Sequence, residues 1–213
     1  MNIGILGSGV VGKALATGFL QQGYDVMVGS RNPKNLEDWK VEIGPELHTG
    51  DFSETAAFGE VIVLAVKGTA AQDVLQMAGI ANLSGKPVLD TTNPLADAEP
   101  VNGVLQFFTS LDQSLMEQLQ QMAPDANFVK IFNSVGAPLM VNPEFESRPT
   151  MFICGNGDSA KTVAGKILDQ FGWEVADMGM AEAARAIEPL GILWCIPGLR
   201  ENRWAHAFKL MRN

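Results

Sequence analysis

The sequence predicts an α/β protein with a doubly wound parallel sheet and a small C-terminal α/β part. Three observations lead to this fold class. A glycine-rich turn joins a short apolar run at 3–6 to a helical stretch at 13–21. An uninterrupted apolar run at 61–65 is typical of a strand that is covered on both faces. Strand-like and helical segments alternate along the chain, which favours parallel strands joined by helices.

The turn carries the spacing Gly-x-Gly-x-x-Gly directly between the first strand and the first helix. Gly7 allows a sharp turn, Gly9 lets the backbone approach a pyrophosphate, and Gly12 allows close packing of helix on strand. Free N–H groups at the positive end of the helix would then bind the pyrophosphate. The motif alone is weak in a chain with 22 glycines, but its place between strand and helix favours a Rossmann dinucleotide site over an ordinary glycine-rich turn.

The end of the expected second strand, 25–29, indicates which dinucleotide is bound. NAD-specific sites carry an acidic residue there, which would repel a 2′-phosphate. This chain instead has Ser30, Arg31 and Asn32, and Lys34 follows. A hydroxyl and a guanidinium can bind a phosphate through charge-assisted hydrogen bonds. The sequence therefore predicts NADP as the cofactor, against the alternative that these residues only begin a surface turn.

The remaining elements follow in alternation. We expect further strands at 61–65, 86–90, 127–132, 150–154 and 173–176, and a small strand or a loop at 47–51. We expect helices at 36–40, 53–55, 69–77, 110–122, 159–171 and 181–195, with a break at Pro197-Gly198 and a last helical piece to 210. The predicted domains are an NADP-binding domain, 1–136, and a small C-terminal domain, 137–213, that completes the acceptor cleft.

Ligands of such sheets bind beyond the carboxyl ends of the strands. The loop at 65–67, the loop at 91–93 and the loop at 133–138 each follow a predicted strand. We therefore expect these loops to lie on the same rim as the glycine turn.

Composition limits the partners and the location. The 213 residues include 24 acidic and 15 basic side chains, and the net charge of -9 argues against nucleic acid or an anionic membrane as partner. The sequence has no membrane-length apolar run and no signal-peptide pattern, so we expect a cytoplasmic protein. Cys154 and Cys195 lie among apolar neighbours and are expected to be reduced core residues. No metal-ligand spacing is present, and no metal site is expected.

A set of motifs extends over nearly the whole chain in a fixed order. They are ILGSGVVGKALA (5–16), VGSRNP (28–33), VILAVK (62–67), VLDTTNP (88–94), KIFNSVGAP (130–138), MFICGNGDSAK (151–161) and DMGMAEAARAIEPL (177–190). On these motifs the chain resembles the NADPH-dependent coenzyme F420 reductase family, whose fold also serves as the nucleotide domain of membrane ferric reductases.

The resemblance implies a role for particular residues. Ser30 and Arg31 would hold the 2′-phosphate of NADP. The pyrophosphate would be lined by Ser8, Val10 and Val11. The adenylate ribose would lie beside Ala65, Val66 and Lys67. The residues facing the nicotinamide would be Asn93, Asn133, Val135, Gly136 and Ala137.

The resemblance also implies a small-molecule redox acceptor, coenzyme F420 or a flavin, and a homodimer. Deazaflavin reductases would have a histidine near position 133 and hydroxyl residues near 180–184. This chain has Asn133 and Met180-Ala-Glu-Ala-Ala184 at these places, so a flavin can replace the deazaflavin.

Hydride transfer between these ring systems is direct and needs no protein base, so no catalytic residue is predicted. His48 and His206 are interpreted as surface or structural residues, and Arg185 and Glu188 are expected to pair on one helix. The acceptor is expected in a cleft between Gly136 and the segment 178–182. Two alternatives stay open: a sensor that binds NADPH without turnover, and a flavin or ferric reductase.

Overall fold

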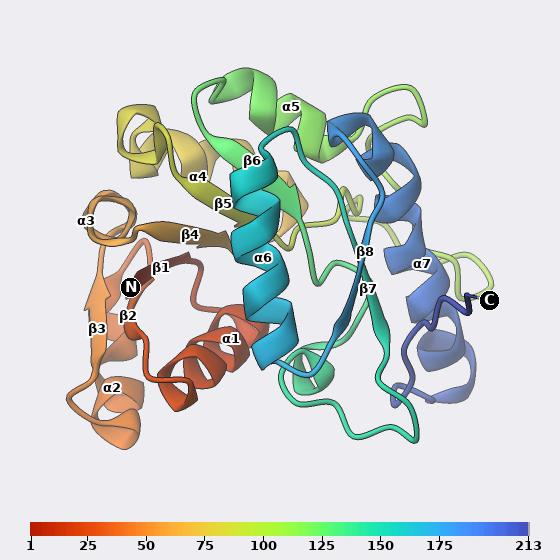
Figure 1. The fold of residues 1–213 in the computed structure, drawn as a ribbon, viewed down its shortest axis with the longest axis horizontal. Coiled ribbons are helices and arrows are strands. Elements are labelled where there is room, and N and C mark those ends of the chain that lie inside the picture. Colours follow the sequence, from red (N-terminus) through yellow and green to blue (C-terminus); the bar gives the residue numbers. More distant parts are fainter. Residues whose placement is uncertain (213) are drawn as a thin grey trace.

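The computed structural model describes residues 1–212 and is built on a six-stranded parallel sheet (Figure 1). The strand order is β3-β2-β1-β4-β5-β6. The strands are β1 (Asn2–Leu6), β2 (Asp25–Gly29), β3 (Leu47–Gly50), β4 (Val61–Leu64), β5 (Pro87–Asp90) and β6 (Asn127–Lys130). The chain reverses its direction across the sheet between β1 and β4, which is where ligands of doubly wound sheets bind. The predicted fold class is confirmed.

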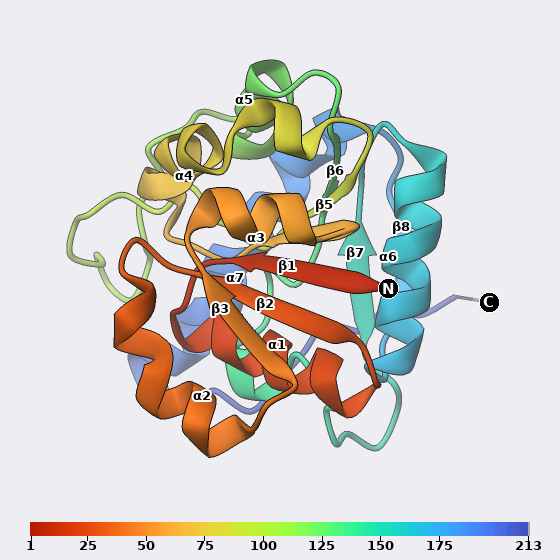
Figure 2. The same ribbon diagram turned by 90° about the vertical axis from the view of Figure 1, so that its left-hand side faces the viewer.

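Helices cover both faces of this sheet (Figure 2). On one face lie α1 (Val10–Gln21) and α6 (Asp158–Gln170), whose apolar side chains share one core cluster with the strands. On the other lie α3 (Phe52–Phe58), α4 (Ala71–Ala78) and α5 (Leu115–Met122). A further helix, α2 (Glu37–Ile43), packs beside β3.

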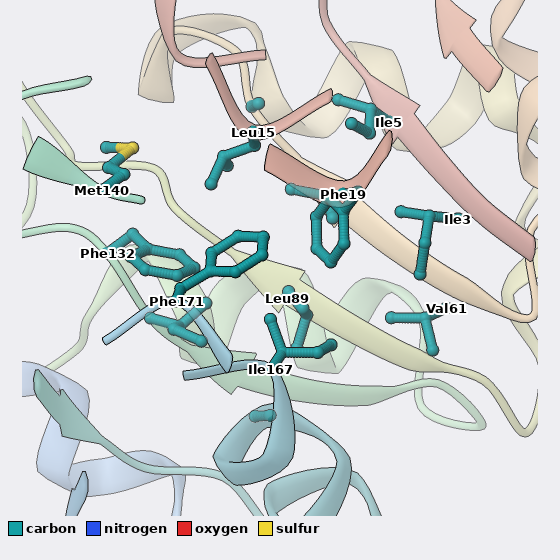
Figure 3. Packing of buried hydrophobic residues seen from close by; sticks show 14 of the residues in the cluster. Ile3, Ile5, Leu15, Phe19, Val61, Leu89, Phe132, Met140, Ile167 and Phe171 are labelled. Carbon is teal, nitrogen blue, oxygen red and sulfur yellow. The ribbon is translucent and has the colours of Figure 1, made fainter. Parts of the chain in front are cut away.

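The C-terminal part shares a core with the nucleotide-binding sheet. Its strands β7 (Thr150–Ile153) and β8 (Glu174–Asp177) form a separate parallel pair. Figure 3 shows Phe171, which follows α6, between Phe19 of α1 and Phe132, with ring centroids 5.0 and 6.1 Å away. The division of the chain at Gly136 stays a prediction, because one apolar cluster includes residues from both sides of it.

An antiparallel bridge between Lys130, the last residue of β6, and Cys154, which follows β7, shows that β7 and β8 run opposite to β6. Because β7 runs opposite to β6, the residues that follow β7 return to the amino end of β6. A Cβ at Gly155 would lie 2.3 Å from the carbonyl oxygen of Phe128, near the start of that strand. The backbone N–H of Gly155 in turn donates to the carbonyl oxygen of Gly179. The loop after β8 therefore lies at the amino end of the main sheet, away from the predicted nucleotide rim.

The last helix, α7 (Ala184–Glu201), differs from the prediction. It continues through Pro197, and the expected break there is wrong. The missing proline N–H leaves only the carbonyl of Leu193, four residues earlier, without its helical partner, and Leu193 is an exposed residue. The helix instead ends at Asn202, which adopts a left-handed conformation with φ 54°.

Two other expected helical segments are also corrected. Residues 202–212 form no helix; this tail joins β7 through a hydrogen bond from Thr150 N to the carbonyl oxygen of Phe208. The helix expected from 110 begins at Leu115, because Ser114 and Glu117 form a capping box there. Within residues 1–212 no helix is both long and apolar enough to cross a membrane.

The expected ion pair between Arg185 and Glu188 is wrong. Arg185 Nε donates to both carboxylate oxygens of Glu117, at 3.1 and 3.0 Å, and so joins α7 to α5. Glu188 is turned toward the sheet and is buried. The hydrogen bonds from Arg185 lower the pKa of Glu117 to about 2.

This pair predicts an acid-dependent loss of stability. The pKa of Glu117 is lower in the folded chain, about 2, than its ordinary 4.5, so its stabilisation is complete above pH 4.5 and is lost as the pH falls toward 2. Arg185→Gln should be less stable than the parent at pH 7, and the difference should shrink at pH 3. Urea denaturation of both proteins at the two pH values measures this, and an equal difference at both would contradict it.

Candidate functional site: the carboxyl rim of the sheet

The three glycines of the first turn differ in whether the fold itself requires glycine at their positions. Gly7 has φ 128°, and a Cβ there would lie 2.2 Å from the carbonyl oxygen of Ala65. A Cβ at Gly12 would lie 2.0 Å from the carbonyl oxygen of Gly7. Both glycines are therefore required by the turn and its packing. A Cβ at Gly9 meets nothing within 4 Å, so the protein itself does not require glycine at that position.

The space beside Gly9 fits a pyrophosphate. Gly9 is the residue before α1, and no side chain caps the helix there. The first turn carries no acidic residue, so its N–H groups and the positive end of the helix are available to an anion. Ser8 and Val11 are half-buried beside this space and Val10 is 75% exposed. The uncapped helix start and the open space fit the diphosphate of a dinucleotide, and the role of these three residues in lining it stays a prediction.

The end of β2 presents a hydroxyl and cations. Ser30 is half-buried, and its Oγ accepts a weak hydrogen bond from Asn32 N at 3.3 Å. Arg31 and Lys34 are exposed, and within residues 1–212 neither forms an ion pair. In a chain with net charge -9, an unpaired guanidinium beside a hydroxyl favours binding of a phosphate.

The loops after β4 and β5 close on the glycine turn. Val66 Cγ1 would lie 2.9 Å from a Cβ at Gly7, so the loop at 65–67 borders the turn. Lys67 is exposed and lies 3.8 Å from Asp97. The next residue, Gly68, packs against the carbonyl oxygen of Asn93. A Cβ at position 68 would lie only 2.0 Å from that oxygen. The predicted ribose and nicotinamide loops are thus brought together on one rim.

Asn93 and Asn133 form a reciprocal amide pair. Asn93 Nδ2 donates to the carbonyl oxygen of Asn133 at 2.7 Å, and Asn133 Nδ2 donates to Asn93 Oδ1 at 3.2 Å. Asn133 Nδ2 also donates to the carbonyl oxygen of Ile187 in α7, and its side chain is buried. Its Oδ1 has no hydrogen-bond partner within the described residues. Asn93 is only half-buried, so its amide is the better placed of the two to meet a ligand.

The space expected beside Gly136 is filled, which corrects one prediction. A Cβ at Gly136 would lie 2.7 Å from the indole ring of Trp194, so glycine is needed there to receive that ring. The indole stacks on His206 at 5.0 Å between centroids and donates to its carbonyl oxygen. Gly136 and Ala137 are half-buried, while Val135 is buried.

The second wall of the expected acceptor cleft is also corrected. Gly179 and Ala181 bond to Gly155 and Asn156, at the amino end of the sheet. The segment 178–182 therefore lies opposite the nucleotide rim. The part of α7 beside the rim is Gly191 to Trp194, where a Cβ at Gly191 would lie 2.7 Å from Asn93 Nδ2.

Comparison with known proteins decides the family. The profile of the family described as "NADP oxidoreductase coenzyme F420-dependent" matches residues 2–94. A solved structure from Arthrobacter sp. FB24, a candidate F420-dependent NADP reductase by its name, superposes with a TM-score of 0.92. It is 31% identical, and the match covers 99% of each chain.

The chain belongs to the coenzyme F420-dependent NADP oxidoreductase family. It is also 34% identical to rat metalloreductase STEAP3 and 27% identical to human metalloreductase STEAP2. These matches cover 92% and 89% of this chain but only 38% and 36% of the two metalloreductases, so the chain spans little more than a third of their length.

The residues predicted from the sequence for the nucleotide end lie on one rim, and their role in binding stays a prediction. The contacts of α7 with this rim were not predicted. Gly191 lies against Asn93 and Asn133, and Trp194 lies against Gly136. One signal was present: Gly191 lies inside a helix, where glycine is unfavourable unless close packing requires it. Asn93 supplies that close contact.

The glycine turn gives a direct test of the nucleotide site. Gly9→Val should abolish NADPH binding and leave the melting temperature nearly unchanged, because its side chain enters open space that the pyrophosphate would occupy. Gly12→Ala is the matched control, and it should destabilise the fold through its contact with the carbonyl of Gly7. Calorimetric titration and thermal melts measure both effects. Retained affinity in Gly9→Val would place the phosphates elsewhere.

Proposed function

We propose that the chain transfers a hydride between NADPH and a planar redox acceptor, a deazaflavin such as coenzyme F420 or a flavin. The observation that carries this proposal is the open space at Gly9, after β1, together with Ser30 and Arg31 at the end of the neighbouring strand β2. Within residues 1–212 Arg31 forms no ion pair. Membership in the NADP oxidoreductase family supports it. NADPH supplies the hydride, and the chain's residues bind and orient the two reactants.

The nucleotide end provides most of the binding contacts. Ser30 and Arg31 would hold the 2′-phosphate, with Asn32 and Lys34 near it. The first turn of α1 would hold the pyrophosphate through its N–H groups. Val66 and Lys67 would lie beside the ribose. Because these contacts lie far from the reacting carbon, they anchor the cofactor without taking part in the chemistry.

The nicotinamide end orients the ring. The half-buried amide of Asn93 and the backbone of 135–137 are the groups available at that rim. Trp194 and Gly191 cover one side of these groups and exclude water from them. Direct hydride transfer needs the rings within about 3–3.5 Å. The hydride leaves the acceptor ring as an anion, which takes its proton from solvent. The proposal therefore assigns no side chain as acid or base.

A metal ion is a second candidate for the final electron acceptor. The observation that favours it is the 34% identity to a metalloreductase across 92% of this chain. In that case the chain would supply the NADPH half of the reaction. A sensor that only binds NADPH is distinguished from both by the absence of turnover.

The preference for NADP over NAD depends on Arg31. Arg31→Ala should weaken NADPH binding by about 2 kcal/mol, about thirtyfold, and leave NADH binding nearly unchanged. Arg203→Ala, which removes an exposed arginine after α7, is the control and should change neither affinity. Fluorescence titration with both nucleotides makes the comparison, and equal losses for NADPH and NADH in Arg31→Ala would refute the assignment.

An acceptor panel tests the reaction itself. Coenzyme F420, FMN, FAD and ferric chelates are each mixed with the purified chain and NADPH, and oxidation of NADPH is followed by its absorbance. Turnover with F420 or a flavin is the expected result, and the fastest of them identifies the acceptor class. Turnover with ferric chelates alone would favour the metal candidate. Binding of NADPH with no oxidation by any acceptor would favour the sensor.

A further inference from the structure

Lys130, the last residue of β6, is fully buried beneath the rim. Its ammonium nitrogen lies 2.6 Å from Asp90 Oδ2 and 2.9 Å from Glu188 Oε1. It also donates a hydrogen bond of 2.9 Å to the carbonyl oxygen of Thr92. Asp90 and Glu188 are buried as well. We call Asp90, Lys130 and Glu188 the buried ion trio; its charges come from β5, β6 and α7.

The trio holds the turn that carries Asn93. Asp90 Oδ1 accepts from Thr92 N at 2.9 Å and from Thr92 Oγ1 at 2.7 Å. With the bond from Lys130, the N–H, the hydroxyl and the carbonyl of Thr92 are all fixed. Asn93 is the next residue, so the position of its backbone depends on these three bonds.

The trio also holds the helix that covers Asn93. Glu188 connects α7 to Lys130, and it accepts from Leu115 N and Met116 N at the start of α5, both at 3.0 Å. One residue earlier on α7, the carbonyl of Ile187 receives Asn133 Nδ2. One turn later, Gly191 lies against the Asn93 amide. The ammonium of Lys130 thus holds the amide pair of Asn93 and Asn133 by two routes, through Thr92 on one side and through Glu188 and α7 on the other.

Stability alone is a weak reason for such a trio. Each buried ion loses several kcal/mol of hydration, and well-packed apolar residues can often replace buried ion pairs without loss of stability. What apolar side chains cannot supply is a fixed direction for Thr92 and for α7, because dispersion contacts are not directional. A nicotinamide ring requires that direction, since a shift of about 1 Å can lower a rate about a hundredfold.

We propose that Lys130 is a positioning residue for hydride transfer. Through Thr92 and Glu188 it holds the amide of Asn93 in the place where the nicotinamide ring is oriented. The proposal rests on the proposed function for the ring's location, but not on which acceptor is used.

The main test neutralises the whole trio in the full chain, with Lys130→Met, Asp90→Asn and Glu188→Gln combined. No uncompensated buried charge is left, so the variant can fold. We expect kcat to fall about 10- to 100-fold. We also expect the primary isotope effect with deuterated NADPH to rise, because hydride transfer becomes slower than the other steps. A parental kcat and isotope effect in the folded variant would overturn the proposal.

A binding measurement tests the same idea without an acceptor. The parent should bind NADPH more tightly than 2′-phospho-ADP-ribose, which lacks the nicotinamide ring. In the neutralised variant the affinity for 2′-phospho-ADP-ribose should stay within about threefold, a small free-energy change. The additional affinity for NADPH should be largely lost, and its full retention would overturn the proposal. A parent that binds both compounds equally would instead place the ring away from this rim, and the proposed function would fail.

Two further variants separate positioning from stability. Arg185→Gln breaks the ion pair between α5 and α7 but touches neither Thr92 nor Asn93, so it should be less stable at unchanged kcat. Thr92→Val removes only the 2.7 Å bond to Asp90 and should fold even if the trio variant does not. Loss of one such hydrogen bond should lower kcat about twofold to tenfold. A parental kcat in Thr92→Val, or an equal loss in Arg185→Gln, would show that the trio is only structural.

Discussion

The burial of one ammonium group, that of Lys130, is the constraint on which the C-terminal half of the structure depends. An ammonium in a protein interior must be paired with negative charge and hydrogen-bonded, because otherwise nothing compensates the loss of its hydration energy. Burial acts to lower the pKa of Lys130, but Asp90 and Glu188 together outweigh it and raise the pKa, so the group stays charged. Because Glu188 belongs to α7, this helix cannot shift along the sheet without leaving a buried charge unpaired.

The same carboxylate also holds the start of α5. Glu188 accepts the N–H groups of Leu115 and Met116, and a negative charge at a helix start is favoured by the helix dipole. Arg185 joins the two helices a second time through Glu117. The Arg185 pair adds stability to the contact between α5 and α7, whereas the bonds of Glu188 set the place of α7 on the sheet. That place brings Gly191 next to Asn93 and Trp194 next to Gly136, and a Cβ at either glycine would clash with its neighbour.

The features that the sequence predicted well are local ones. The turn at 7–12 and the Ser30-Arg31 pair follow their strands directly, and the strand and glycine patterns identify them without knowledge of the rest. The errors are non-local. Arg185 and Glu188 have the spacing of a helical pair, yet each finds a partner about 60 to 70 residues away in sequence. A lysine inside the apolar strand at 127–132 was the available signal, because such a residue requires buried carboxylates.

The local features and the long-range contacts also belong to different parts of the proposed site. The nucleotide end is formed by β1, β2 and the turns after them, and the family profile, 2–94, stops just beyond Asn93. In the proposed function the acceptor side would be formed by the loop at 133–137 and by α7, which long-range contacts bring together. On the proposed function, changes on α7 would alter the space above the nicotinamide while the phosphate contacts are kept. Trp194 occupies the place beside Gly136, so on the proposed function the shape available to an acceptor would be set by a side chain more than 50 residues away in sequence.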